Sequence, residues 1–234
     1  FTRPGDCDDL ITLQDANHGL HSVYRSGNEL FYTPLDDSFN PAPPERIAAN
    51  FRYPDLAVSP MLELWVVAFD PVLEKHHLWH RDEPDHFTGE IVTLAEPDKL
   101  SAVEPEAQLV AREHDVLLLL AGVFDQVPGL HLFSRGATDT DFVWRDTVHT
   151  TAYRDRNSRC FELLQDGRTR LVYTDSSTWG SARTITPEGT VFSAPHFGCC
   201  DALNAGCAVD WRTGDVAVLT PGNWAVWTWN DLEE

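Results

Sequence analysis

Short runs of β-branched and aromatic residues recur along the chain, and a polar turn separates the two runs of each pair. In one pair, residues 160–164 are followed by a polar turn at 165–168 and by a second run at 169–174. A strand, a tight polar turn and a second strand form the pattern of a β-hairpin. No segment of comparable length has an apolar stripe at helical spacing, so the sequence predicts an all-β fold. The other hairpins are expected at residues 22–33, 55–69, 108–121 and 207–220.

The spacing of the five hairpins predicts how their sheets are organised. Successive steps between equivalent apolar positions are 34, 52, 55 and 45 residues, and the step through the two chain ends is 48. Repeats of roughly 40–50 residues, each a small antiparallel sheet, are typical of β-propellers. We therefore predict a five-bladed β-propeller that forms a single domain over residues 1–234. The positions used are Leu30, Leu64, Val116, Leu171 and Val216.

Ring closure gives the last of these steps a physical reason. Residues 9–13 beside residues 224–229 would complete one blade from the N- and C-terminal strands and leave no open sheet edge. A β-sandwich with irregular loops is the alternative architecture.

Two stretches of the sequence resemble a known family of blades. The phrases SVYRSGNELFYT, RYPDLAVSP and LWVVAFD, and later LVYTDSSTWGSARTITPEG with VFSAPHF, are similar to the propeller domain of prolyl-oligopeptidase-family peptidases and to TolB-type repeats. The resemblance implies a propeller fold. Those peptidases also need a hydrolase domain with a G-x-S-x-G motif. This sequence contains no such motif, so we expect no peptidase activity.

Composition excludes several classes of partner. Acidic side chains outnumber basic ones by 37 to 17, giving a formal net charge of −20. Such a surface repels phosphate backbones and anionic membranes. The longest apolar run, residues 116–123, is far shorter than the roughly 18 residues of a spanning helix. We expect neither nucleic acid nor a membrane as partner, and the sequence leaves the compartment open, secretion included.

The five cysteines have no C-x-x-C spacing, which argues against a zinc ribbon or a thioredoxin-type site. A disulfide from Cys7 to one of Cys199, Cys200 and Cys207 is one interpretation, and buried thiols are the other. A nucleophilic cysteine beside His196 is disfavoured because nothing else indicates an oxyanion hole.

One histidine-rich segment could in principle hold a metal ion, since histidine and carboxylate suit Zn²⁺. We interpret it instead as a solvated loop and expect neither a metal nor another cofactor. The segment contains His76, His77, His80 and His86 with Asp82, Glu83 and Asp85.

Aromatic residues divide into two expected groups. Trp65, Trp211, Trp224 and Trp227 are expected to pack between blades, because aromatic rings supply large buried areas. Trp144, Trp179 and Trp229 are free to line a sugar-stacking or apolar pocket. Residues 174–179 resemble a sialidase-type Asp box but lack its glycine.

The central channel of a propeller is the expected ligand site, because inner strands and the loops entering them line it. We predict binding of a small molecule or carbohydrate there. The alternative is an enzyme at the channel mouth, a glycoside hydrolase or a cyclase that uses histidine and carboxylate groups as acid and base, with its catalytic residues not identified. A protein-interaction scaffold is a third hypothesis. The candidate ligand-binding residues are His18, His21, Arg52, Tyr53, Asp55, Glu106, Gln108, Arg159 and His196.

Overall fold

The computed structural model describes residues 7–15, 17–83, 86–149, 160–174, 179–193, 197–198, 206–210, 212–220 and 223–227. Within these ranges every regular element is a strand except one short 3-10 helix, η1 (Pro97–Lys99). None of the helical structure in these ranges is long and apolar enough to cross a membrane. The predicted all-β fold is confirmed.

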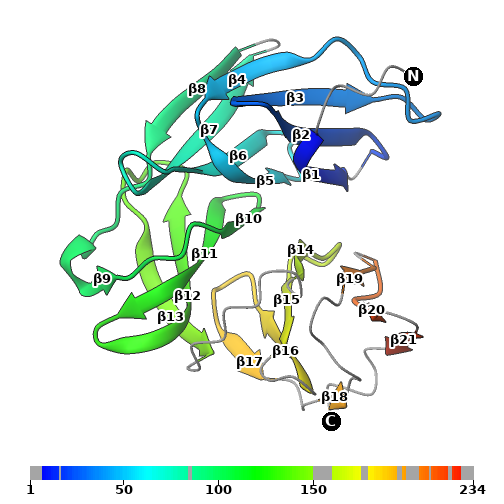
Figure 1. Cartoon of the computed structure of the whole chain (residues 1–234). Coiled ribbons are helices and arrows are strands. Elements are labelled where there is room, and N and C mark those ends of the chain that lie inside the picture. Colours follow the sequence, from blue (N-terminus) through cyan, green and yellow to red (C-terminus); the bar gives the residue numbers. More distant parts are fainter. Residues whose placement is uncertain are drawn as a thin grey trace. The chain divides into compact units, whose positions relative to one another are not determined.

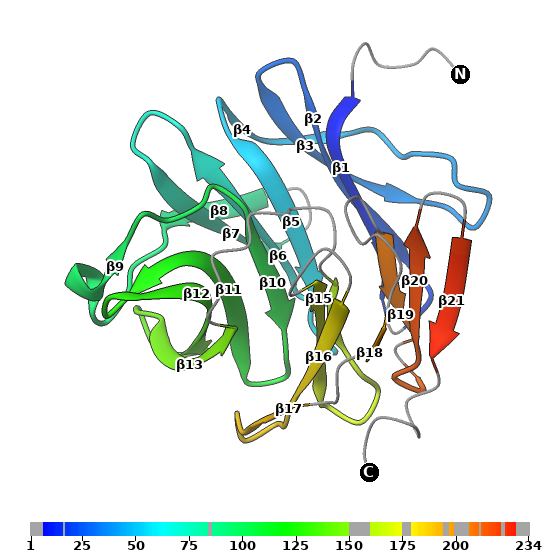
Figure 2. The same cartoon turned by 60° about the horizontal axis from the view of Figure 1, so that its bottom comes forward.

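Strands that follow one another along the chain pair into five antiparallel sheets (Figures 1 and 2). The first sheet contains β1 (Cys7–Gln14), β2 (Leu20–Ser26), β3 (Glu29–Leu35) and β4 (Glu45–Ala49). The second contains β5 (Arg52–Val58), β6 (Leu64–Asp70), β7 (Lys75–Glu83) and β8 (His86–Ile91). The third contains β10 (Ala107–Ala111), β11 (Asp115–Phe124), β12 (Val127–Gly136) and β13 (Val143–His149), and β9 (Leu100–Ser101) pairs with β11.

The fourth and fifth sheets follow the same order. The fourth contains β14 (Cys160–Leu163), β15 (Thr169–Thr174), β16 (Trp179–Ile185) and β17 (Val191–Ser193), and β18 (Phe197–Gly198) pairs with β16. The fifth contains β19 (Gly206–Val209), β20 (Val216–Thr220) and β21 (Asn223–Trp227). Four sheets thus have the four consecutive strands of a propeller blade, and the fifth has three described strands. A count of five blades and closure of the ring stay predictions.

All five predicted hairpins exist, but the first lies one strand later in its sheet than expected. Residues 22–33 form β2 and β3, so Leu30 lies on a third strand, whereas Leu64 lies on the second strand β6. The residue that corresponds to Leu64 is Leu20, because each follows a turn of the same length, 15–19 or 59–63. This difference explains the short first step of the repeat. Residues 9–13, expected beside 224–229, lie in β1 and pair with β2.

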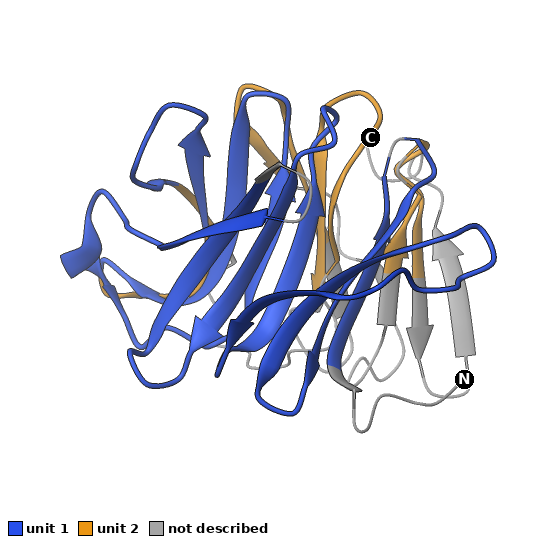
Figure 3. Ribbon diagram, turned by 90° about the horizontal axis from the view of Figure 1, so that it is seen from above, with its two compact units in different colours: residues 1–125, 132–144 blue, residues 126–131, 145–234 orange. Residues whose placement is uncertain are grey.

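Contacts along the chain divide it into two compact units (Figure 3). The first contains residues 1–125 and 132–144, and the second contains residues 126–131 and 145–234. The first two sheets belong to the first unit, together with most of the third. The prediction of a single domain stays a prediction.

The second sheet is apolar on both faces. Leu64 and Val66 of β6 pack with Val23 of the first sheet. Val67, which points to the opposite face, packs with Leu118 of the third sheet. A central strand buried on both sides reads as a continuous apolar run rather than an alternating one, which explains the sequence LWVVAFD of β6.

Cys160 is buried and disulfide-bonded. The interpretation of all five cysteines as buried thiols is therefore wrong for this residue. The other four cysteine side chains lie outside the described residues, so the disulfide predicted for Cys7 stays a prediction.

Candidate functional site

Strand β5 carries three of the residues expected to bind a ligand, Arg52, Tyr53 and Asp55. A bulge between Arg52 and Asp55 interrupts the pairing of β5 with β6. Tyr53, within this bulge, has a φ of 52°, which residues other than glycine rarely adopt. Strand β1 has a bulge at the same place, where Asp9 has a φ of 56°. Bulges of this kind redirect side chains and are frequent beside functional sites.

Asp55 connects β5 to the adjacent strand β10. Its Oδ2 accepts a hydrogen bond of 2.7 Å from the backbone N–H of Leu109. The residue keeps some solvent-accessible surface, yet protein atoms surround its carboxyl group closely. This burial raises the pKa of Asp55 to about 7, against hydrogen bonds from the backbone of Leu109 and Leu56 that lower it. At neutral pH the carboxyl can therefore hold or release a proton.

The structure places the other predicted residues as follows. Gln108 lies on β10 next to the residue bonded to Asp55, and Glu106 is half-buried just before that strand. His18 is exposed in the β1–β2 turn with a φ of 68°. Arg159 and His196 lie outside the described residues. Strand neighbours thus bring Asp55 and Gln108 together, and His18 lies apart from them on its own turn.

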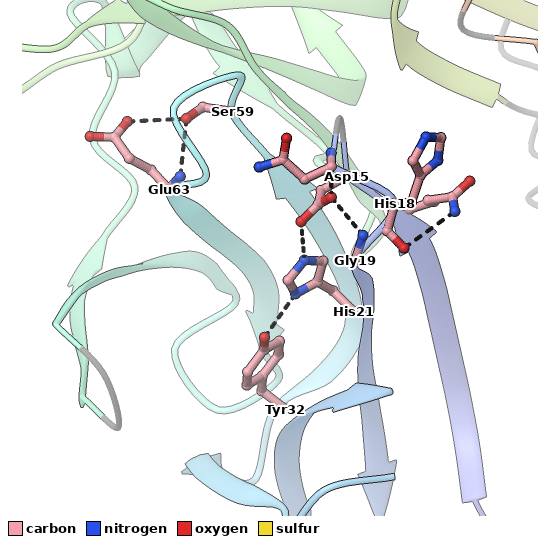
Figure 4. A network of polar contacts seen from close by, with 9 residues as sticks. Asp15, His18, Gly19, His21, Tyr32, Ser59 and Glu63 are labelled. Atoms are coloured by element: carbon pink, nitrogen blue, oxygen red, sulfur yellow. Dashed lines mark hydrogen bonds and ion pairs between the residues drawn. The ribbon is translucent and has the colours of Figure 1, made fainter. Parts of the chain in front are cut away.

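His21 lies at the centre of a hydrogen-bonded chain within the first sheet (Figure 4). Its Nε2 is 2.9 Å from Oδ2 of Asp15, and its Nδ1 is 2.8 Å from the hydroxyl oxygen of Tyr32. Asp15 holds the β1–β2 turn, because its Oδ1 accepts the backbone N–H groups of Asn17 and Gly19. The three side chains are therefore held in one geometry by the turn on one side and the sheet on the other.

The matching turn of the second sheet shows what is special about Asp15. Ser59 occupies the corresponding position, and its Oγ accepts the backbone N–H group of Glu63 at 3.1 Å (Figure 4). It also accepts the backbone N–H group of Met61 at 3.2 Å. A hydroxyl therefore suffices for the turn. Only a carboxylate has a second oxygen that can also reach His21.

Electrostatics define the charge states at the two ends of this chain. Burial opposes ionisation of Asp15, but hydrogen bonds from His21, Gly19 and Asn17 outweigh it, and the pKa of Asp15 lies below its usual value. Burial raises the pKa of Tyr32 to about 12, and the charges of Glu45 and Asp15 add to this while Arg81 opposes it. Asp15 is thus a carboxylate and Tyr32 a neutral phenol at physiological pH. With His21 neutral, its Nε2–H donates to Asp15 and its Nδ1 accepts the Tyr32 hydroxyl.

Two cross-strand pairs extend the hydrogen-bonded series Asp15–His21–Tyr32 from the first sheet to the second. Tyr32 and Glu45 are direct partners on β3 and β4, and Arg81 and Phe87 are direct partners on β7 and β8. Arg81 forms an ion pair with Glu45 at 3.1 Å, and its guanidinium carbon lies 5.1 Å from the centre of the Tyr32 ring. The side chains of Arg81 and Glu45 are 20% and 16% exposed, although the Nε atom of Arg81 and the Oε2 atom of Glu45 are themselves buried.

We call these six residues the Tyr32 cluster: Asp15, His21, Tyr32, Glu45, Arg81 and Phe87. The cluster offers hydrogen-bond donors, charged acceptors and aromatic rings within one small region. Such a combination suits a ligand with hydroxyl groups and an apolar face. Sequence reasoning identified only His21, because the Arg81–Glu45 pair joins positions that become neighbours only when two sheets pack together.

The histidine-rich segment is a strand, not a solvated loop. His76, His77 and His80 lie on β7. His76 is buried, its Nε2 lies 3.1 Å from the carbonyl oxygen of Pro105, and burial lowers its pKa to about 4. His80 stacks on Trp65, with ring centres 3.9 Å apart. The stacking of His80 on its cross-strand partner Trp65 and the bond of His76 to Pro105 explain why this polar sequence forms a strand. Among the described residues, no group of three or more His, Cys, Asp or Glu is placed to hold a metal ion.

The tryptophan predictions can be compared at two positions. Trp65 packs against the core shared by the second and third sheets, as predicted. Trp144 is 38% exposed and stacks on Phe124, and its place in a ligand pocket stays a prediction. Five side chains lie outside the described residues: Trp179, Trp211, Trp224, Trp227 and Trp229.

No protein-family profile matches the sequence, and no curated protein is similar to it. Among solved structures, the chain is similar to the SapL1 lectin in complex with α-methyl fucoside, with 10% identity and a TM-score of 0.61. The match covers 94% of this chain and 79% of the lectin. A triple arginine-to-alanine variant of AofleA from Arthrobotrys oligospora matches with 10% identity and a TM-score of 0.53, over 94% of this chain and 71% of that protein.

Enzymes share the fold as well. The β-fructofuranosidase BmSUC1 from Bombyx mori has 8% identity and a TM-score of 0.55, over 91% of this chain and 54% of the enzyme. The Hadza microbial sialidase Hz136 has 9% identity and a TM-score of 0.53, over 80% of this chain and 46% of the enzyme. The chain thus spans about half the length of these two enzymes. It resembles a β-propeller of the kind found in lectins and glycosidases, and the resemblance to prolyl-oligopeptidase and TolB blades stays a prediction.

Proposed function

We propose that the protein binds carbohydrate and that the Tyr32 cluster is a binding site. The Arg81–Glu45 pair supports this most directly, because it combines a donor and an acceptor with the half-buried ring of Phe87, next to the buried ring of Tyr32. A guanidinium donates to sugar hydroxyl groups and a carboxylate accepts from them. The C–H face of a sugar packs on an aromatic ring, and Phe87 is the half-buried ring of the cluster.

The structural neighbours support the class of ligand. One is a lectin bound to a fucoside, and two others are enzymes that act on carbohydrates. Five blades and a closed ring would fit this use, with the fifth sheet as the fifth blade. A closed ring would have a central channel, and Arg52, Tyr53 and Asp55 on β5 with Gln108 on β10 would then be the alternative place for a sugar to bind.

A glycan array followed by titration calorimetry tests the proposal, with α-methyl fucoside as the first probe. Arg81→Lys keeps the charge but removes the planar fork, and Glu45→Gln removes the charged acceptor. We expect each variant to lose at least tenfold in affinity, about 1.4 kcal/mol. Arg46→Lys and Glu29→Gln are the matched controls, since Arg46 and Glu29 form an exposed ion pair on the neighbouring strands. Absence of binding to every glycan, or binding unaffected by Arg81→Lys, would refute the proposal.

A glycoside hydrolase is the alternative, and Asp55 is the observation that favours it. An inner-strand carboxyl with a pKa of about 7 is suited to general acid catalysis near neutral pH. Hydrolysis needs a second carboxylate roughly 5–10 Å away, for which Glu106 is the candidate. Release of 4-nitrophenol from aryl glycosides, abolished by Asp55→Asn, would support this alternative. No turnover by the intact chain would exclude it for those substrates.

A further inference from the structure

Side chains alternate in a consistent way along the first strand of each sheet. Each first strand pairs across a tight turn with the second strand, so its residues can be counted back from the turn. In β1, Leu13 and Ile11 are second and fourth from the end, and in β5, Val58 and Leu56 are first and third. All four belong to the apolar cluster shared by the first and second sheets. Even positions therefore face the following sheet, and odd positions face the preceding one.

The second and third sheets follow the same rule. Ala57, second from the end of β5, belongs to one apolar cluster with Leu109 and Ala111, which are third and first from the end of β10. Asp55, fourth from the end of β5, reaches the following sheet, where its Oδ2 accepts the backbone N–H of Leu109. A residue at the fourth position thus lies within side-chain reach of the third position on the next first strand.

The fourth and fifth sheets have cysteines at these two positions. In the fourth sheet, β14 ends at Leu163, and Cys160 is fourth from the end. In the fifth sheet, β19 ends at Val209, and Cys207 is third from the end. Strands β14 and β19 contact one another within the second unit. The two cysteines therefore correspond to the two residues that the hydrogen bond joins between the second and third sheets.

We infer that Cys160 forms its disulfide with Cys207, so that a covalent bond ties the fourth sheet to the fifth. Cys160 is 7% exposed and disulfide-bonded, so its partner must come from an element packed against β14, and β19 is such an element. A disulfide needs Cα atoms roughly 4.4–6.8 Å apart, which facing positions on adjacent strands provide. The bond takes the place that the hydrogen bond of Asp55 has between the second and third sheets.

Formation of this bond is a two-electron oxidation. Each thiol gives up one proton and one electron as the two Sγ atoms join, and the disulfide of an exchange partner takes up both protons and both electrons and becomes two thiols. Glutathione and thioredoxin keep cytosolic thiols reduced, so the bond requires an oxidising compartment. Neither cysteine belongs to the Tyr32 cluster, so the disulfide and carbohydrate binding are tested separately.

Peptide mapping without reduction tests the pairing. The intact chain, secreted into an oxidising compartment, is alkylated and digested with trypsin and with an endoproteinase that cleaves before aspartate. Residues 160–165 then form one peptide and residues 201–209 another, while Cys199 and Cys200 lie on a third. We expect peptides 160–165 and 201–209 to be joined until a reductant separates them. Peptide 160–165 recovered unlinked, or joined to any other cysteine, would overturn the inference.

Melting temperatures give a second test. Cys160→Ala and Cys207→Ala should each lower the melting temperature by roughly 10 °C, because the bond closes residues 160–207 into a loop. The double variant should melt with the single variants, since all three lose the same bond. Cys199→Ala and Cys200→Ala are the matched controls and should keep the joined peptides. A Cys207→Ala variant that melts like the wild type would overturn the inference, and the mapping of the wild type needs no variant to fold.

Discussion

Asp55→Asn gives the most quantitative prediction from the fold. The pKa of Asp55 is raised from about 3.8 to about 7 in the folded chain, chiefly by burial. The folded state then binds more protons than the unfolded state between these values, so stability falls as the pH rises from about 4 to about 7 and is constant above. Roughly three pKa units at 1.36 kcal/mol each give a loss of at most about 4 kcal/mol.

Asparagine cannot ionise, and its amide oxygen can still accept the Leu109 N–H bond that Asp55 accepts. Urea denaturation should therefore show Asp55→Asn close to the wild type at pH 4 and more stable by up to about 4 kcal/mol at pH 8. Asp37→Asn, at an exposed loop position, controls for the loss of one negative charge from an acidic protein. An Asp55→Asn variant whose stability relative to the wild type is the same at pH 4 and pH 8 would refute the burial argument.

Three further predictions concern the first unit. Tyr32→Phe removes the hydroxyl bonded to His21 and should cost about 1–2 kcal/mol in urea denaturation; no change would mean that this bond contributes nothing to stability. Asp15→Ser should keep the turn bonds that a serine makes in the second sheet and so be more stable than Asp15→Ala, by about 1 kcal/mol; equal melting temperatures would contradict this. Gly122→Ala would place a Cβ 3.2 Å from the backbone oxygen of Ser101, so it should lower the melting temperature more than Gly136→Ala, whose Cβ meets only the side chain of Asp139. A lower melting temperature for Gly136→Ala than for Gly122→Ala would contradict the contact with the Ser101 backbone.

The strand pattern of the fold was predictable because hairpins are local. The run from 160 to 174 contains both strands and the turn that joins them, and the structure pairs Cys160 with Val172 as a hairpin requires. The repeat alone could not predict that residues 22–33 form the second and third strands of the first sheet rather than its first and second. Its first strand, β1, is polar at alternate positions with aspartates at 8 and 9, and it lacks the apolar run that identifies β6 or β11.

The candidate sites were less predictable, because they depend on contacts between sheets. Asp55 was predicted from the expectation that its strand lines a channel, but its raised pKa comes from the packing around it. The bulge at Tyr53 carries no glycine that would have indicated a positive φ. Arg81 and Glu45 lie on different sheets, and no local pattern predicts their pairing. Within the second sheet, the polar segment around His80 forms a strand because His80 stacks on its cross-strand partner Trp65.

The most direct test of carbohydrate binding at the Tyr32 cluster is a nuclear magnetic resonance titration of the isotopically labelled chain with a neutral sugar. We predict that the signals of the Arg81 guanidinium and of the Phe87 ring shift in a saturable way, while those of Arg52 and Asp55 on β5 do not. Saturable shifts confined to Arg52, Tyr53 and Asp55, with none at Arg81, would contradict the assignment of the site.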